Sequence, residues 1–172
     1  MPAGCVRIVP TSGDFETDPL PFEKHCSKSL DWEFIESLNL ERATMCEISR
    51  LAVDGAFRRR SGEALTRFGE VDAMDCSHQE RRSFSLIAVA GFLVSNALTD
   101  LTGRTNGFAM MEPFLPRLLK RSGIFFQRAG QDINYHGIRA PYFNTTQSVL
   151  HSMRPDLREL YDWIRKQIGE SY

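Results

Sequence analysis

The chain has 172 residues, of which 42% are hydrophobic and 25% charged, and its formal net charge is −1. This length predicts a single domain whose core is large enough to fold without disulfides or metal. The composition excludes collagen-like, fibrous and wholly disordered chains. The balanced charge predicts no nucleic-acid partner. The longest apolar run, residues 86–94, is shorter than the roughly 20 residues that cross a bilayer, so we expect no transmembrane segment.

The cysteines and histidines are scattered along the chain. The four cysteines form no C-x-x-C pair, and the chain opens without the basic and apolar regions of a signal peptide. We therefore expect reduced thiols in a cytoplasmic protein. The four histidines show no spacing typical of zinc or iron ligands, so no metal site is expected.

The first third of the chain predicts two strands and a helix. Residues 5–9 form a strand-like run closed by Pro10, and residues 11–28 have the composition of a loop. Residues 29–40 have the apolar spacing of a short helix. Residues 45–53 alternate as a strand, but the apolar phase slips around Ser49 and Arg50. Such a slip is typical of a β-bulge.

The rest of the chain alternates between helices and strands. Residues 54–82 carry many charges and few clustered apolar side chains, so we expect 61–82 to be a mobile loop. The further predicted elements are a buried helix over 83–103 ended by Gly103, a strand over 105–111, a helix from Pro113 to Gly123, short strands over 124–130 and 132–136, and a C-terminal helix over 154–172. This order predicts one mixed α/β domain over residues 1–172.

The strand over 45–53 and the arginine run after it have the chemistry of a thioester-binding site. A bulge breaks pairing with the next strand and leaves a wedge, into which a phosphopantetheine arm can pair as an extra strand. An arginine–glycine turn offers guanidinium groups and backbone N–H groups to a phosphate. The donor-binding residues expected on this basis are Leu51, Ala52, Val53, Arg58, Arg59, Arg60, Ser61 and Gly62.

Five segments together resemble the GNAT acyltransferase core. Gly4-Cys-Val-Arg-Ile-Val-Pro-Thr11 and Glu47-Ile-Ser-Arg-Leu-Ala-Val53 are similar to the acyl-homoserine-lactone synthase branch. A larger set resembles the sister group of that branch, the long-chain N-acyl amino acid synthases and PEP-CTERM/exosortase-associated acyltransferases. This set consists of Glu47-Ile-Ser-Arg-Leu-Ala-Val53, Phe57-Arg-Arg-Arg60, Met111-Glu-Pro-x-Leu-x-Arg-Leu-Leu119 and Tyr135-His-Gly-Ile-Arg-x-Pro-Tyr142. The resemblance spans about residues 3–143 and implies a GNAT-like mixed sheet flanked by helices, without the N-terminal part that family members carry. The phosphate turn departs from the family pattern, because Glu63 separates Gly62 from the small residue Ala64.

The resemblance implies an N-acyltransferase. Such an enzyme moves a fatty acyl group from acyl-carrier protein or acyl-CoA to the amine of an amino acid or similar small molecule. The thioester is then a co-substrate, either acyl-CoA or acyl-phosphopantetheine, and no tightly bound cofactor is expected. Two other functions stay open: a non-catalytic GNAT-like remnant that acts as a binding module, and a short-chain acetyl-CoA-dependent N-acetyltransferase.

Glu47 and Arg50 are the expected catalytic residues. Glu47 on a core strand can take a proton from the attacking amine as a general base, or it can form a salt bridge with Arg50 or Arg7. The resemblance places Arg7, Tyr135 and His136 at the substrate, with ion pairing or packing as their alternative roles. Arg58–Arg60 can equally form a solvated turn. Most of the residues Phe108, Met110, Met111, Phe114, Phe125 and Phe126 are expected in the core, and some of them along an acyl tunnel. No partner spacing supports Cys46 or Cys76 as a nucleophile.

Overall fold

The computed structural model describes residues 4–12, 17–53 and 78–170, with the backbone alone over 78–86. The strands are β1 (Gly4–Pro10), β2 (Met45–Val53), β3 (Asn106–Met111), β4 (Gln127–Arg128), β5 (Ile133–Asn134) and β6 (Ile138–Thr145). The helices are α1 (Pro21–Cys26), α2 (Trp32–Ser37), α4 (His78–Leu101), α5 (Leu115–Lys120), α6 (Thr146–Ser152) and α7 (Pro155–Gly169), with 3-10 turns at Ser27–Ser29 and Arg42–Thr44.

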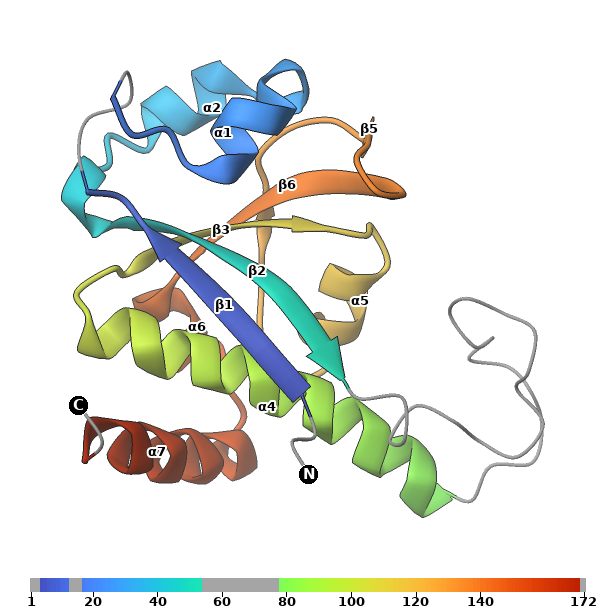
Figure 1. Ribbon diagram of the computed structural model, residues 1–172. Helices are drawn as coiled ribbons and strands as arrows, with labels where there is room; N and C mark the ends of the chain where they lie inside the picture. Colours follow the sequence, from blue (N-terminus) through green and yellow to red (C-terminus); the bar gives the residue numbers. More distant parts are fainter. Residues whose placement is uncertain (1–3, 13–16, 54–77, 171–172) are drawn as a thin grey trace.

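The strands form one mixed sheet between two helical layers. The strand order is β1-β2-β3-β6-β4, with β5 also paired to β6. Helices α1 and α2 cover one face, whereas α4 crosses the other face with α7 packed against its outer side (Figure 1). The fold is the mixed α/β sheet flanked by helices that the sequence predicts.

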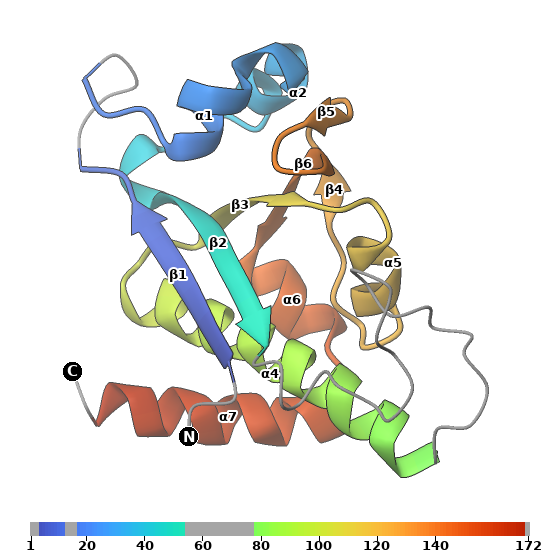
Figure 2. The same cartoon turned by 45° about the vertical axis from the view of Figure 1, so that its right-hand side comes forward.

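The central pair of strands separates part-way along its length. Strands β2 and β3 run parallel and pair only from Met45 to Glu47 on β2, opposite Asn106 to Phe108 on β3. Beyond Glu47 the two strands diverge, and β2 continues beside β1 alone (Figure 2). The sheet is therefore split at its middle, with Glu47 at the apex of the split.

The bulge predicted at Ser49 and Arg50 is confirmed. Arg7 of β1 lies opposite Ser49, but Cys5 lies opposite Ala52, so β2 carries one extra residue in this stretch. Arg50 has a φ of 57°, which is uncommon for a residue with a side chain. An inserted residue bends the strand that carries it, which accounts for the departure of β2 from β3.

Each face of the sheet has its own apolar cluster. On the α4 face, Cys46 and Ile48 pack with Phe92 and Leu93. On the α1 face, the ring of Phe108 stacks on Phe22 of α1 with 4.9 Å between centroids, and contacts the ring of Phe143 at the same distance. The aromatic contact holds α1 against the strands beside the split.

Several predicted elements are confirmed. The strands over 45–53 and 105–111 are β2 and β3, and Gly103 ends α4 with a φ of 69°. The C-terminal helix opens at Pro155 and ends at Gly169. The helix expected over 29–40 is present but shorter, because the Asp31 side chain caps it by accepting a hydrogen bond from the Phe34 N–H.

Other predictions about the elements are wrong. Residues 11–28 are not all loop, since α1 lies within them, and residues 78–82 belong to α4 rather than to a mobile loop. The remainder of the predicted loop, 61–77, lies outside the described residues. Helix α5 begins at Leu115 and not at Pro113, and the strands predicted over 124–136 reduce to two pairs of residues. The pattern also did not predict β6 or α6.

Candidate active site

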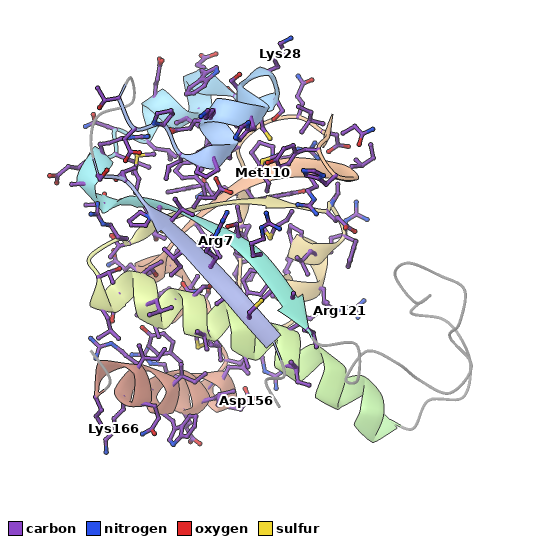
Figure 3. All side chains as sticks on the ribbon, viewed as in Figure 1. Arg7, Lys28, Met110, Arg121, Asp156 and Lys166 are labelled. Carbon is purple, nitrogen blue, oxygen red and sulfur yellow. The ribbon has the colours of Figure 1, made fainter. Side chains whose placement is uncertain are left out.

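A cleft of about 710 Å³ opens where β2 and β3 diverge. Arg7 of β1 and Met110 of β3, both labelled in Figure 3, are among its lining residues. Residues from both helical layers contribute, including Pro21 of α1 and Phe92 of α4. The cleft therefore reaches both faces of the sheet through the split.

Most of the site residues predicted from the sequence meet in this cleft. Its lining includes Arg7, Glu47, Arg50, Leu51, Ala52, Tyr135 and His136. Val53 is buried at the end of β2 opposite Gly4 and does not line the cleft. Arg58, Arg59, Arg60, Ser61 and Gly62 lie outside the described residues.

Glu47 is a buried carboxyl group on the wall of the cleft. Its relative exposure is 6%, and its Oε2 accepts a 2.6 Å hydrogen bond from the backbone N–H of Phe22. Burial raises the pKa of Glu47 above its ordinary value of 4.5, and the charge of Glu23 acts in the same direction. The Phe22 N–H and the positive charge of Arg7 oppose this shift. A carboxylate with a raised pKa is a stronger base than an exposed one.

The salt bridge considered for Glu47 is not formed. Neither Arg7 nor Arg50 makes an ion pair with it in the described residues; the Arg7 Nε instead donates to Ser49 Oγ at 3.1 Å. The side chain of Arg50 is exposed at the bulge, and its carbonyl accepts a hydrogen bond from the Cys5 thiol at 3.5 Å. Glu47 is thus held by a backbone amide, which leaves its second oxygen without a described partner.

A buried ion pair anchors the start of α1, the helix that supplies this amide. Glu23 accepts two hydrogen bonds from the Arg42 guanidinium, at 2.5 and 2.7 Å, and a third from the Leu20 N–H at 2.6 Å. Arg42 also donates to the carbonyl of Asp18 at 2.9 Å. Because Phe22 lies between Leu20 and Glu23, this network fixes the amide that binds Glu47.

Three aromatic rings pack together beside the cleft. The ring of Tyr135 lies parallel to that of His25 at 6.4 Å and meets the ring of His136 edge-on at 4.8 Å. His136 has a φ of 54° and Gly137 a φ of 106°, as in the tight turn that joins β5 to β6. The turn presents Tyr135 and His136 beside α1, where both line the cleft.

The sequence analysis missed two charged residues of the cleft, Glu112 and Arg139. Both lie within segments that resemble the acyltransferases, after Met111 and after Ile138, so the motifs contained the signal that could have found them. Met110, Met111 and Phe114 line the cleft, whereas Phe114 and Phe125 are exposed and do not belong to the core. The cleft is therefore lined by both apolar and charged side chains.

The thiol of Cys46 is unsuited to nucleophilic attack. Burial raises its pKa to about 12, and its Sγ lies 3.5 Å from the carbonyl oxygen of Arg104, to which it donates. Cys76 lies outside the described residues. Among the residues that the structure describes, no group of three histidine, cysteine or acidic side chains could hold a metal ion. None of the described helices is long and apolar enough to cross a membrane.

Comparison with known proteins gives matches only among solved structures. No family model matches the chain, and no curated protein matches it. The structure of TofI in a ternary complex with an inhibitor and MTA has a TM-score of 0.53 and 17% identity, covering 90% of this chain and 65% of that one. Two further structures have lower TM-scores. The acyl-homoserine-lactone synthase LasI has a TM-score of 0.45 and 15% identity, covering 88% of this chain and 65% of that one. The CoA-dependent acyl-homoserine-lactone synthase MesI has a TM-score of 0.46 and 14% identity, covering 95% of this chain and 63% of that one.

The chain thus spans about 65% of the length of the TofI chain that it matches. At these identities the likeness concerns the fold. The chain shares with TofI the fold of a mixed α/β sheet flanked by helices.

Proposed function

We propose that this chain is an N-acyltransferase that moves an acyl group from acyl-CoA or acyl-carrier protein to the amine of an amino acid or similar small molecule. The observation that carries the proposal is the position of Glu47, a buried carboxyl group at the apex of a cleft that passes through the sheet. Arg50, on the bulge of the same strand, is the second proposed catalytic residue. The fold likeness to acyl-homoserine-lactone synthases supports an acyltransferase.

The donor is proposed to lie along the free edge of β2. Between Ser49 and Ala52 this strand pairs with β1 on one side and has no β3 partner on the other. An extended pantetheine arm has amide groups that can bond to such an edge, as added strands do. Leu51 and Ala52 supply the edge, and the arginine run that follows in the sequence, residues 58–62, is proposed to bind the phosphate.

The two ends of the cleft suit different parts of the reactants. Phe92, Met111 and Leu115 lie on the α4 and α5 side and offer apolar surface to an acyl chain. Pro21, Tyr135 and His136 lie on the α1 side, where Arg7 and Arg139 add positive charge. We place the acyl chain on the first side and the amine acceptor on the second, with the thioester at the split between them.

The proposed reaction is a direct attack. The neutral amine adds to the thioester carbonyl and forms a C–N bond, while Glu47 accepts the amine proton directly or through one water. Collapse of the tetrahedral intermediate breaks the C–S bond, and the thiolate that leaves takes up a proton. A protonated amine has no lone pair for this attack, so a base beside it is required. The raised pKa of Glu47 fits this role.

Two alternatives stay open, and the structure offers an argument about each. A remnant that only binds a partner has no use for a buried carboxyl group on the wall of the cleft, because burying such a group is costly. An acetyltransferase needs little space for its acyl group, whereas this cleft holds about 710 Å³ with apolar residues on one side. The first observation favours an enzyme, and the second favours transfer of a longer chain. The cytoplasmic location expected from the sequence remains a prediction.

The proposal is tested by incubating the 172-residue chain with acyl-CoA of 2 to 16 carbons, each with a mixture of amino acids, and identifying products by mass spectrometry. A second series supplies the same chains on acyl-carrier protein. We expect N-acyl products from the long-chain donors and little from acetyl-CoA. Faster acetyl transfer would support the acetyltransferase instead. Absence of any N-acyl product in both series, while the donors bind, would support the binding module.

A further inference from the structure

Arg139 of β6 is a charged residue of the cleft to which neither the fold nor the proposed reaction assigns a role. Its side chain is half-buried and lines the cleft, yet it makes no hydrogen bond or ion pair with any residue that the structure describes. Arg7, in contrast, is engaged by Ser49. A half-buried guanidinium is costly to desolvate without a partner, so the site calls for an anion.

The sheet register places Arg139 on the same face as Glu47. Glu47 pairs with Phe108, and Phe108 pairs with Phe143. Directly paired residues share a face, and every second residue along β6 returns to that face. Arg139 is four residues from Phe143, so its side chain and that of Glu47 both belong to the face covered by α1.

The thiol of Cys26, at the end of α1, lies close to both groups. Burial and the charge of Glu47 raise its pKa, whereas the charge of Arg139 lowers it. Four residues of strand correspond to about 13 Å, so the backbones of Glu47 and Arg139 are too far apart for their side chains to meet. A small molecule bound beneath α1 can bridge them.

We infer that Arg139 binds the carboxylate of the acceptor and so determines the specificity of acyl transfer for amines that carry one. This inference rests on the proposed function and extends it to a specific residue. The planar guanidinium can donate two parallel hydrogen bonds to a carboxylate. With the carboxylate on Arg139, the amine of the same molecule is directed toward Glu47 at the apex of the split. A simple amine lacks the group that Arg139 recognises.

Glu112 offers the alternative partner for Arg139. Met111 pairs with Ala140 at the end of the β3–β6 ladder. Glu112 is the next residue after Met111, and Arg139 is the residue before Ala140, so continuation of the ladder would set these two opposite each other. Both side chains line the cleft, but no ion pair joins them. A structural pair would make Arg139 indifferent to the acceptor, and a test must separate the two roles.

The test measures binding by calorimetry, without a thioester, for two matched pairs of compounds: leucine with 3-methylbutylamine, and phenylalanine with phenethylamine. We expect the unsubstituted chain to bind the amino acid of at least one pair more tightly than its amine. Arg139→Met should weaken binding of that amino acid by roughly 10- to 100-fold, as expected for charge-assisted hydrogen bonds, and leave the amine unaffected. Arg128→Met, which removes an exposed arginine of β4 outside the cleft, should change neither affinity. Glu112→Gln, which removes a competing carboxylate, should not weaken amino-acid binding.

Three results would overturn the inference. The first is equal affinity for amino acid and amine in the unsubstituted chain, and the second is an unchanged amino-acid affinity in Arg139→Met. The third is that Arg139→Met loses affinity for CoA and keeps its affinity for the amino acid, which would assign Arg139 to the donor phosphate. Acyl transfer is measured separately on the same proteins. Amino-acid binding through Arg139 without any transfer would refute the proposed function alone, whereas equal transfer to both members of each pair would refute the inference alone.

Discussion

The backbone N–H of Phe22 donates a 2.6 Å hydrogen bond to Oε2 of Glu47, across the boundary between α1 and β2. The bond occupies one carboxyl oxygen and leaves the other without a described partner. It also ties the apex of the split to a helix that packs on the sheet through the Phe22–Phe108 stack. The position of Glu47 therefore depends on how firmly the start of α1 is held.

Replacement of Glu47 should change the way in which stability depends on pH. The folded chain holds the Glu47 proton more tightly than the unfolded chain, because burial raises the pKa above 4.5. As the pH rises from about 4.5 through the raised pKa, Glu47 therefore lowers the free energy of unfolding. Glu47→Gln cannot ionise and keeps an oxygen for the Phe22 N–H. The variant should gain stability relative to the unsubstituted chain as the pH rises through this range.

Urea unfolding at several pH values measures this difference. Comparison of the two chains at each pH removes the contribution of the other carboxyl groups, which titrate in both. A difference that does not vary with pH would mean that Glu47 has an ordinary pKa in the folded chain.

Breaking the Arg42–Glu23 pair should destabilise the fold strongly. Arg42→Met leaves Glu23, whose side chain is 2% exposed, as a buried charge with a single backbone donor. Loss of one partner of such a pair costs about 3–5 kcal/mol. Arg165→Met breaks the more exposed pair with Asp100 and should destabilise the fold much less. Denaturant unfolding measures the free energy of unfolding of both variants. A similar decrease in both would show that the pair between Arg42 and Glu23 does not anchor α1.

Gly130 should tolerate no side chain. A Cβ at this position would collide with the carbonyl oxygen of Ser29, a backbone atom that also accepts a 2.7 Å hydrogen bond from the Gln131 N–H. Gly130→Ala must move backbone and should cost about 1–3 kcal/mol or more. Gly169→Ala is the matched control, because its Cβ meets only Leu101 at 3.7 Å. Thermal unfolding of Gly130→Ala at an unchanged midpoint would contradict the close approach of the two segments.

The pattern of apolar residues predicted the elements that pack through one continuous face. Helix α7 follows from local periodicity, since it buries side chains along one face, whereas β2 buries Met45 to Ile48 without a break and was predicted from its apolar residues and their phase slip. Strand β6 was not predicted, because Pro141 stands in its middle and a proline argues against a central strand. Here Pro141 faces Met110 and still accepts a hydrogen bond from the Ala129 N–H at 2.9 Å, so the sheet tolerates it.

The site was predictable to the extent that its residues lie in recognisable segments. Glu47, Arg50, Tyr135 and His136 were named from motifs, and the fold brings them to one cleft. The hydrogen bond from Phe22 could not be predicted, because α1 is a short helix in a segment with the composition of a loop. Arg139 lies in one of these segments, but its place on the α1 face depends on the register of β6, which is set by tertiary pairing.

The arginine run over residues 58–60 should contribute to donor binding. Arg58, Arg59 and Arg60 follow β2 in the sequence and lie outside the described residues. Replacing all three with alanine should weaken acyl-CoA binding by about 10-fold or more, since charge-assisted hydrogen bonds contribute about 1.5–3 kcal/mol each. Binding to the unsubstituted chain should also weaken as salt rises. Calorimetry measures both effects, and an unchanged affinity in the triple variant would remove these arginines from the donor site.

The most direct test of the account is the turnover of Glu47→Gln with the best donor and acceptor pair. If Glu47 is the general base, turnover should fall by about 10²–10⁴-fold, donor affinity should barely change, and the deficit should shrink as rising pH supplies neutral amine. Glutamine keeps the shape of the side chain and the bond from Phe22, so a well-folded variant is expected. Near-full turnover in Glu47→Gln, with the same pH profile as the unsubstituted chain, would contradict the account and require a base elsewhere.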